Sequence, residues 1–86
     1  MKVYSIYDQK TGVYDRPFLQ HTHGEAERNF KQLVNDEKSQ VNKFPEDYDL
    51  YYLGEYDNNT GKYQTLDTPQ HLIKAVQLKE QHLALQ

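Results

Sequence analysis

The octapeptide YDQKTGVY, residues 7–14, returns 49 positions later as YDNNTGKY, residues 56–63. Tyr, Asp, Thr, Gly and Tyr keep their order and spacing in both copies. Asp can hydrogen-bond the backbone two residues on, and Gly adopts positive φ without steric cost, so each copy predicts a tight turn. The alternative, a phosphate nest built from Thr-Gly amides, is disfavoured because each copy begins with an Asp that repels phosphate. We therefore expect the same hairpin turn twice.

The residues around the first copy predict two strands. Lys2–Asp8 is rich in β-branched and aromatic residues, with Tyr4 and Ile6 on one face and Val3, Ser5 and Tyr7 on the other. The return strand is expected over Val13–Leu19. Pro17 cannot donate to a strand ladder, so this strand should be an edge or end nearby.

A helix is expected after the first hairpin. Thr22 and Glu25 have the spacing of a capping box. One apolar stripe follows at helical spacing, formed by Ala26, Phe30, Leu33 and Val34. The helix should end near residues 35–38, where a polar connection begins.

The second copy predicts the same order of elements. Tyr48–Asp57 is the strongest strand pattern, and Lys62–Leu66 is the expected return strand. Thr68 and Pro69 resemble an N-cap followed by Pro at the first helical position. The apolar stripe of this second helix would comprise Leu72, Ile73, Val76 and Leu83, and the last residues of the chain are expected to fray.

These elements predict an α+β fold of one domain, residues 1–86. It is a ββα–ββα pseudo-repeat, an antiparallel sheet of about four strands with two helices on one face. The first unit covers residues 1–38, the connection 39–47 and the second unit 48–86. Two hairpins on separate sheets, or a sheet completed by a second subunit, remain open alternatives.

Composition limits the classes of protein. Only 36% of the 86 residues are hydrophobic, which is lean for a small monomer and makes a homodimer plausible. No Cys is present, which excludes disulfides and thiolate sites. No apolar run approaches the roughly 20 residues of a membrane span, so a soluble protein inside the cell is expected.

Charge is distributed unevenly along the chain. The net charge is −3, which argues against strong non-specific binding of nucleic acid. Residues 44–67 contain one base, Lys62, beside the acids Glu46, Asp47, Asp49, Glu55, Asp57 and Asp67. An anionic partner is therefore expected to meet the first third of the chain or the helices.

Tyrosines and bases supply the candidate binding residues. Helices cover one face of a sheet, so some of the eight tyrosines should lie on the open face or under a partner. Tyr48, Leu50, Tyr52 and Tyr56 share one face of their strand, and Tyr51 and Leu53 share the other. Exposed tyrosines could stack on single-stranded nucleic acid; cross-strand pairs or a dimer interface are the alternatives. The candidates for nucleic-acid binding are Lys2, Tyr4, Lys10, Tyr14, Arg16 and Tyr52.

Signals for catalysis or metal binding are weak. His21 and His23 would point the same way in an extended segment, but no third ligand is close in sequence. The chain contains no GxSxG, P-loop lysine or HExxH pattern. We expect no enzyme activity, no cofactor and no metal.

The stretch KFPEDYDLYYLGEYDNNTGKYQ, residues 43–64, resembles the small non-structural protein of gokushoviruses, single-stranded DNA phages of the microvirus group. The opening MKVYSIYDQKTG, VNDEKS at 34–39 and DTPQHL at 67–72 resemble that family as well. The resemblance implies a protein that is absent from the virion shell and acts in the cytoplasm of the infected bacterial host. It also implies binding to DNA during the shift from genome replication to packaging. A protein–protein adaptor, which grips a phage replication, scaffold or host protein, is the alternative.

Overall fold

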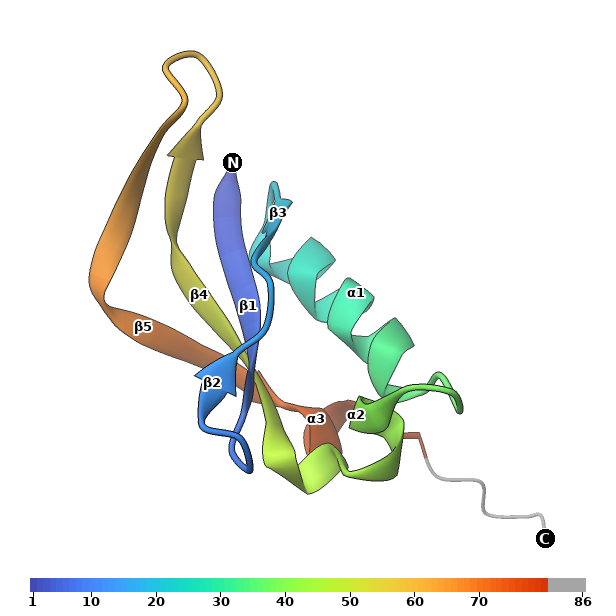
Figure 1. Cartoon of the computed structure of the whole chain (residues 1–86). Helices are drawn as coiled ribbons and strands as arrows, with labels where there is room; N and C mark the ends of the chain where they lie inside the picture. Colours follow the sequence, from blue (N-terminus) through green and yellow to red (C-terminus); the bar gives the residue numbers. More distant parts are fainter. Residues whose placement is uncertain (81–86) are drawn as a thin grey trace, which may run out of the picture.

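The computed structural model describes residues 1–80 and contains an antiparallel sheet with helices packed on it (Figure 1). The strands are β1 (Lys2–Asp8), β2 (Val13–Tyr14), β3 (Phe18–Gln20), β4 (Tyr48–Asp57) and β5 (Lys62–Lys74). The helices are α1 (His23–Val34), α2 (Gln40–Lys43), the 3-10 helix η1 (Pro45–Asp47) and α3 (Ala75–Leu78). The sheet order is β2-β1-β4-β5. Strand β2 pairs with the end of β1, and β3 pairs with its beginning. The predicted α+β class is confirmed, and both hairpins lie in one sheet.

Both octapeptides form the same turn, as predicted. The carbonyl of Asp8 accepts the Gly12 N–H at 2.8 Å, and that of Asp57 accepts the Gly61 N–H at 2.7 Å. Each Asp carboxylate also accepts the backbone N–H two residues on, at 2.9 Å in both copies. The two glycines have φ of 75° and 74°, which is why Gly stands at this position.

The tyrosines of each octapeptide also have a role in the hairpin. Tyr7 lies opposite Tyr14, and Tyr56 lies opposite Tyr63. In both pairs the ring centroids are 4.8 Å apart. Cross-strand aromatic pairs stabilise antiparallel strands, so the octapeptide encodes a turn together with the clamp that closes it.

The predicted return strand Val13–Leu19 is divided into β2 and β3. Residues 15–17 belong to neither strand, although the Asp15 N–H still donates to the Ile6 carbonyl at 2.8 Å. Pro17 lies in this interruption because it has no N–H to donate. The predicted effect of Pro17 is thus confirmed.

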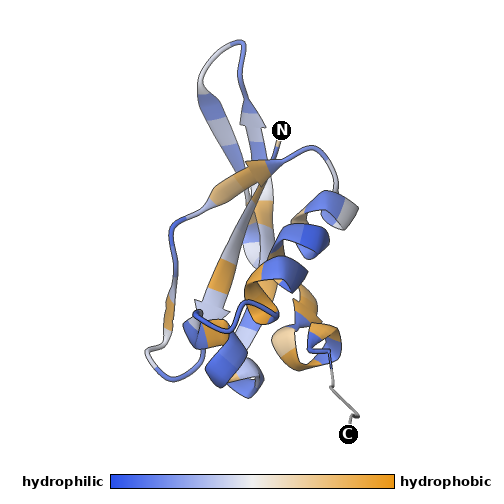
Figure 2. Ribbon diagram, turned by 90° about the vertical axis from the view of Figure 1, so that its right-hand side faces the viewer, coloured by the Kyte–Doolittle hydropathy of each residue, from blue (hydrophilic) through white to orange (hydrophobic). Residues whose placement is uncertain are grey.

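Helix α1 begins and ends where the sequence predicts. The Thr22 hydroxyl accepts the Glu25 N–H, and the Glu25 carboxylate accepts the Thr22 N–H, which completes the capping box. Its apolar stripe packs on the sheet and on the short helices (Figure 2). The buried hydrophobic residues that pack together are Tyr4, Ala26, Phe30, Val34, Val41, Leu50 and Ala75. Val41 belongs to α2, in the predicted connection 39–47, so that connection contributes to the core.

The predicted second helix beginning at Pro69 is wrong. Residues 68–74 belong to β5, and the helix α3 comprises only Ala75–Leu78. Between the pairs Gly54–Thr65 and Tyr52–Gln70, four residues of β5 oppose one of β4, which is a large bulge. Pro69 is tolerated there because bulges and edge strands do not require its missing N–H. Leu83 and the last residues, 81–86, lie outside the described residues.

Gly54 allows β5 to cross closely over β4 beside this bulge. Its φ is 149°, a conformation that favours glycine. A Cβ at this position would lie 2.2 Å from the Gln64 carbonyl oxygen and 2.7 Å from the Thr65 Cα. Both atoms belong to the backbone, so they cannot move aside without displacing the strand.

We expect Gly54→Ala to lower the free energy of unfolding by about 2 kcal/mol or more, because it adds overpacking to backbone strain. Denaturant unfolding monitored by circular dichroism measures this loss. Gly24→Ala is the matched control, because a Cβ there meets only the Thr22 hydroxyl at 3.8 Å. It should leave stability unchanged or raise it by up to about 1 kcal/mol. Equal effects of the two variants would contradict the close crossing.

Candidate functional site

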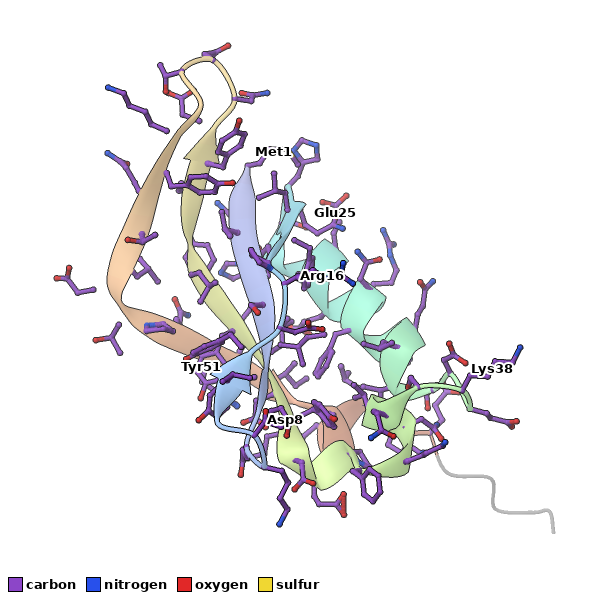
Figure 3. All side chains as sticks on the ribbon, viewed as in Figure 1. Met1, Asp8, Arg16, Glu25, Lys38 and Tyr51 are labelled. Atoms are coloured by element: carbon purple, nitrogen blue, oxygen red, sulfur yellow. The ribbon has the colours of Figure 1, made fainter. Side chains whose placement is uncertain are left out.

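One face of the sheet carries aromatic side chains from four strands. Tyr14 of β2, Tyr7 of β1, Tyr51 of β4 and His71 of β5 lie side by side, and we call these four residues the aromatic row. Side chains alternate between the faces of a strand. Leu50, next to Tyr51, packs under α1 in the core, so Tyr51 points to the opposite face (Figure 3).

The rings of the row contact one another mainly edge to face. Tyr14 and Tyr51 have centroids 5.5 Å apart with planes at 81°, and Tyr51 and His71 are 5.3 Å apart at 84°. Such arrangements are favourable for aromatic pairs. Tyr14 is 42% exposed and His71 is also exposed, whereas Tyr7 and Tyr51 are half-buried. Burial, followed by the neighbouring Tyr51 and Tyr7, raises the pKa of Tyr14.

A buried carboxylate lies next to the row. Asp49 is only 3% exposed, and its Oδ2 atom lies 2.8 Å from the His71 Nε2 and 3.4 Å from the Lys74 Nζ. The Gln9 amide donates to its Oδ1 at 3.4 Å. These donors satisfy the carboxylate, as burial requires. Lys74 balances the charge of Asp49, so this polar group adds little net positive charge to the face.

Three of the predicted site residues lie together elsewhere, around Glu55. The Tyr52 hydroxyl donates to the Glu55 carboxylate at 2.5 Å, and the Lys2 Nζ lies 3.2 Å from the same oxygen. The Tyr52 hydrogen bond is the main cause that lowers the pKa of Glu55. Tyr52 packs against the core, and its ring centroid lies 5.6 Å from that of Tyr4.

Tyr4 cannot stack on a ligand, contrary to its predicted role. Its side chain is fully buried, between Phe18, Tyr52 and His23. Its hydroxyl lies 2.6 Å from the His23 Nδ1. The sequence predicts that Tyr4 and Tyr7 occupy opposite faces, and the helix covers the face that holds Tyr4. Tyr4 is therefore a core residue.

The remaining predicted residues are dispersed. Tyr14 belongs to the aromatic row. Lys10 lies exposed in the first turn, beside a cavity of about 330 Å³ that is also lined by Phe44 and Asp47. Arg16 lies on the segment between β2 and β3, apart from Tyr51 (Figure 3). The predicted bases do not form one continuous groove.

Sequence reasoning missed Tyr7, Tyr51 and His71 as members of a site. The octapeptide contained the signal for Tyr7, because two tyrosines at equal distances from a turn must face each other across a hairpin. The strand pattern placed Tyr51 on the face opposite Leu50 but could not say which of the two faces the helices cover. The erroneous helix after Pro69 removed His71 from the sheet.

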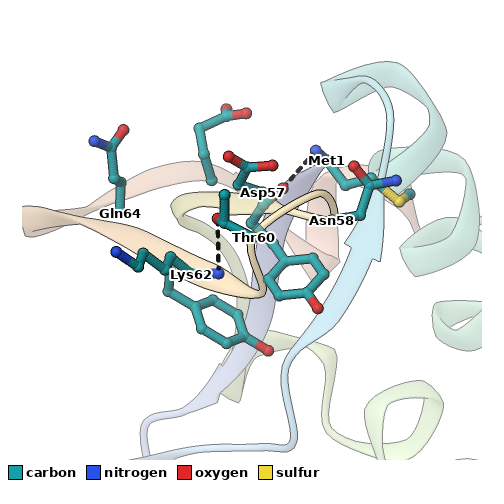
Figure 4. A pocket seen from close by; sticks show the side chains of 9 residues that line it. Met1, Asp57, Asn58, Thr60, Lys62 and Gln64 are labelled. Atoms are coloured by element: carbon teal, nitrogen blue, oxygen red, sulfur yellow. Dashed lines mark hydrogen bonds between the residues drawn. The ribbon is translucent and has the colours of Figure 1, made fainter.

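A second aromatic pair, Tyr56 and Tyr63, lies next to the turn that joins β4 to β5. We call residues 54–65 the arm (Figure 1). A polar cavity of about 540 Å³ lies along the arm (Figure 4). Tyr56 and Tyr63 line it with Lys62 and the acids Glu55 and Asp57. The N-terminal ammonium of Met1 adds a second positive charge, so two acids face two cations, and no excess of positive charge favours an anionic ligand.

Residues 1–80 contain no group of three or more His, Asp or Glu side chains that could hold a metal ion. In the pair predicted as possible ligands, His23 instead contacts the Tyr4 hydroxyl, and the backbone N–H of His21 donates to Glu25. Within the same residues, no helix is both long enough and apolar enough to cross a bilayer.

Comparison with known proteins identifies relatives among phages. The family described as Phage ORF5 protein matches residues 1–78. Protein ORF5 of Chlamydia phage 1 is 35% identical over 72 residues, which cover 78% of this chain and 74% of the relative. Neither description names an enzymatic activity. No solved structure matches the chain.

The buried Tyr4 predicts a loss of stability in alkali. Burial raises the pKa of its phenol to about 12, and the neighbouring Tyr52 and Glu55 add to the shift. The unfolded chain releases this proton near the ordinary value of 10.0. The stability that results is therefore complete below pH 10 and is lost as the pH rises toward 12.

We expect the midpoint of urea unfolding to fall between pH 10 and 12, and ultraviolet titration should show a tyrosine that ionises only near pH 12. Tyr4→Phe should remove that late ionisation, whereas Tyr63→Phe, at an exposed position, should leave it in place. Late ionisation that persists in Tyr4→Phe would contradict the assignment.

Proposed function

The chain belongs to the family of phage ORF5 proteins, and from this premise we propose that it binds single-stranded DNA during genome replication or packaging. The relative belongs to Chlamydia phage 1, a gokushovirus, in agreement with the resemblance found in the sequence. Gokushoviruses carry single-stranded genomes, so such DNA accompanies the protein in an infected cell. The proposed place of action is the cytoplasm of the bacterial host.

The aromatic row is the observation that supports this proposal. Proteins that bind single strands stack bases on aromatic side chains, and every base offers a flat face for that contact. Four-stranded sheets whose open face carries aromatic residues stack two or three bases in this way. Here Tyr14 and His71 are exposed at the two ends of the row, and Tyr7 and Tyr51 lie between them.

Electrostatics favours weak binding, led by stacking. The net charge is −3, and Lys74, the lysine beside the row, already faces Asp49. Each phosphate that a protein neutralises on a single strand contributes a slope of about −0.7 to log K against log[salt]. With one lysine beside the row, we propose that log K falls against log[salt] with a slope of about −0.7, the value for one neutralised phosphate.

A protein–protein adaptor is the second candidate, and a hydrophobic groove favours it. Two neighbouring cavities of about 390 and 320 Å³ share Ile6 and Leu33, between α1 and the strands β2 and β3. Val13, Phe18, Phe30 and Val41 add further apolar side chains to the lining, and Tyr14 and Tyr48 add aromatic ones. A phage replication, scaffold or host protein could insert apolar side chains there.

Tyr14→Ala tests the proposed DNA site, because Tyr14 is the most exposed tyrosine of the row. We expect it to weaken binding of a fluorescent oligothymidine about 5-fold to 150-fold, the loss of one base–aromatic stack worth about 1–3 kcal/mol. Fluorescence anisotropy at two salt concentrations measures both the affinity and the salt slope.

Phe44→Ala is the control, because Phe44 is an aromatic residue that is 48% exposed and lies outside the row. It should bind the oligonucleotide as the unchanged protein does. If the unchanged protein shows no binding at low salt, the DNA hypothesis fails and the adaptor hypothesis remains. Equal losses in both variants would remove the aromatic row as the site.

A further inference from the structure

Strand β5 is a long edge strand. It comprises 13 residues and pairs only with β4, at the end of the sheet order β2-β1-β4-β5. Strands of globular proteins usually have about 5–6 residues, and exposed edges normally carry charges, prolines or bulges that prevent pairing with another chain. Here the bulge and Pro69 interrupt the middle of β5, while residues 62–65 run as a regular strand before it.

The backbone of the arm shows which groups of β5 point outward. Tyr56 exchanges two hydrogen bonds with Met1, with N–O distances of 2.7 and 2.9 Å. Its backbone groups therefore point toward β1, so the pair Tyr56–Tyr63 is not hydrogen-bonded. The N–H and C=O of Tyr63 must then point away from β4, and by alternation those of Thr65 do the same.

The side chains of this edge are exposed and uncharged. Tyr63 is 60% exposed and Leu66 is 38% exposed, which makes them two of the large hydrophobic residues on the surface. Gln64 and Thr65, between them, are also exposed. The nearest charges, Lys62 and Asp67, have opposite signs and flank the segment at its two ends.

We propose that this edge is a dimer interface, at which the segment Lys62–Leu66 pairs antiparallel with the same segment of a second copy. Tyr63 of each copy exchanges backbone hydrogen bonds with Thr65 of the other, and the two Gln64 residues face each other at the two-fold axis. This register uses the outward-pointing groups of both strands. It satisfies the symmetry of a closed dimer, in which one patch meets itself.

Charge complementarity favours a second copy as the occupant of this edge. Antiparallel pairing places Lys62 of one copy close to Asp67 of the other. The two-fold symmetry produces this contact between opposite charges at both ends of the paired segment. No like charges face each other within the segment 63–66. The small hydrophobic content of the chain, 36%, adds a reason to bury Tyr63 and Leu66 between two copies.

A single cysteine tests the register. In the proposed dimer, residue 64 forms a pair without hydrogen bonds, whose Cα atoms lie about 4.5 Å apart, within the range that a disulfide spans. The chain has no Cys, so Gln64→Cys can form only an intermolecular disulfide. We expect rapid formation of a linked dimer in air on a non-reducing gel. Gln32→Cys, on the exposed side of α1, is the matched control and should remain largely unlinked.

Thr65→Pro tests the hydrogen bonds. It removes an N–H that points away from β4, so it should turn a dimer into a monomer in light scattering while the circular dichroism spectrum is kept. Thr65→Val retains the N–H and should remain dimeric. The proposal is overturned if the unchanged protein has the mass of one chain at all micromolar concentrations, or if folded Thr65→Pro stays dimeric. Equal cross-linking of the two cysteine variants would overturn the register as well.

Discussion

The antiparallel pairing of β1 with β4 is the interaction on which the other features of the structure depend. Seven residue pairs join these strands, from Lys2–Glu55 to Asp8–Tyr48, in the middle of the sheet. The register brings Tyr4 beside Tyr52 and Ile6 beside Leu50 under α1. A slip of one residue would exchange the faces of all these side chains. The same register therefore assigns Tyr4 to the core and leaves Tyr7 and Tyr51 on the uncovered face.

Local patterns were predictable wherever one local interaction decides the structure. The capping box of Thr22 and Glu25 fixes the start of α1, and Gly12 and Gly61 fix the turns. Residues 68–74 were mispredicted because Leu72, Ile73 and Val76 have helical spacing after an N-cap pattern. There β4 pairs with Gln70, His71, Ile73 and Lys74, and this tertiary pairing overrides the local preference. The candidate site was harder still, since alternation separates two faces without showing which one a helix will cover.

The duplicated octapeptide shows how one local structure acquires two roles. Both copies form equal turns and equal tyrosine pairs, so the local physics is the same. Their surroundings differ, however. Tyr7 and Tyr14 meet Tyr51 and become part of the aromatic row, whereas Tyr56 and Tyr63 stand on the arm. The different surroundings of the two tyrosine pairs thus come from the neighbouring strands and not from the octapeptide.

The two proposed surfaces compensate for each other's weakness. Stacking on one row, with little net positive charge, gives only weak binding to a single strand of DNA. In a dimer joined at β5, the two-fold axis is perpendicular to the plane of the joined sheet. Corresponding faces of the two arms therefore lie on the same side of that sheet. Two rows that reach one flexible DNA strand would bind it with an affinity well above that of either row, because the second contact becomes intramolecular. Taken together, the two proposals would let an acidic protein hold single-stranded DNA without a basic groove.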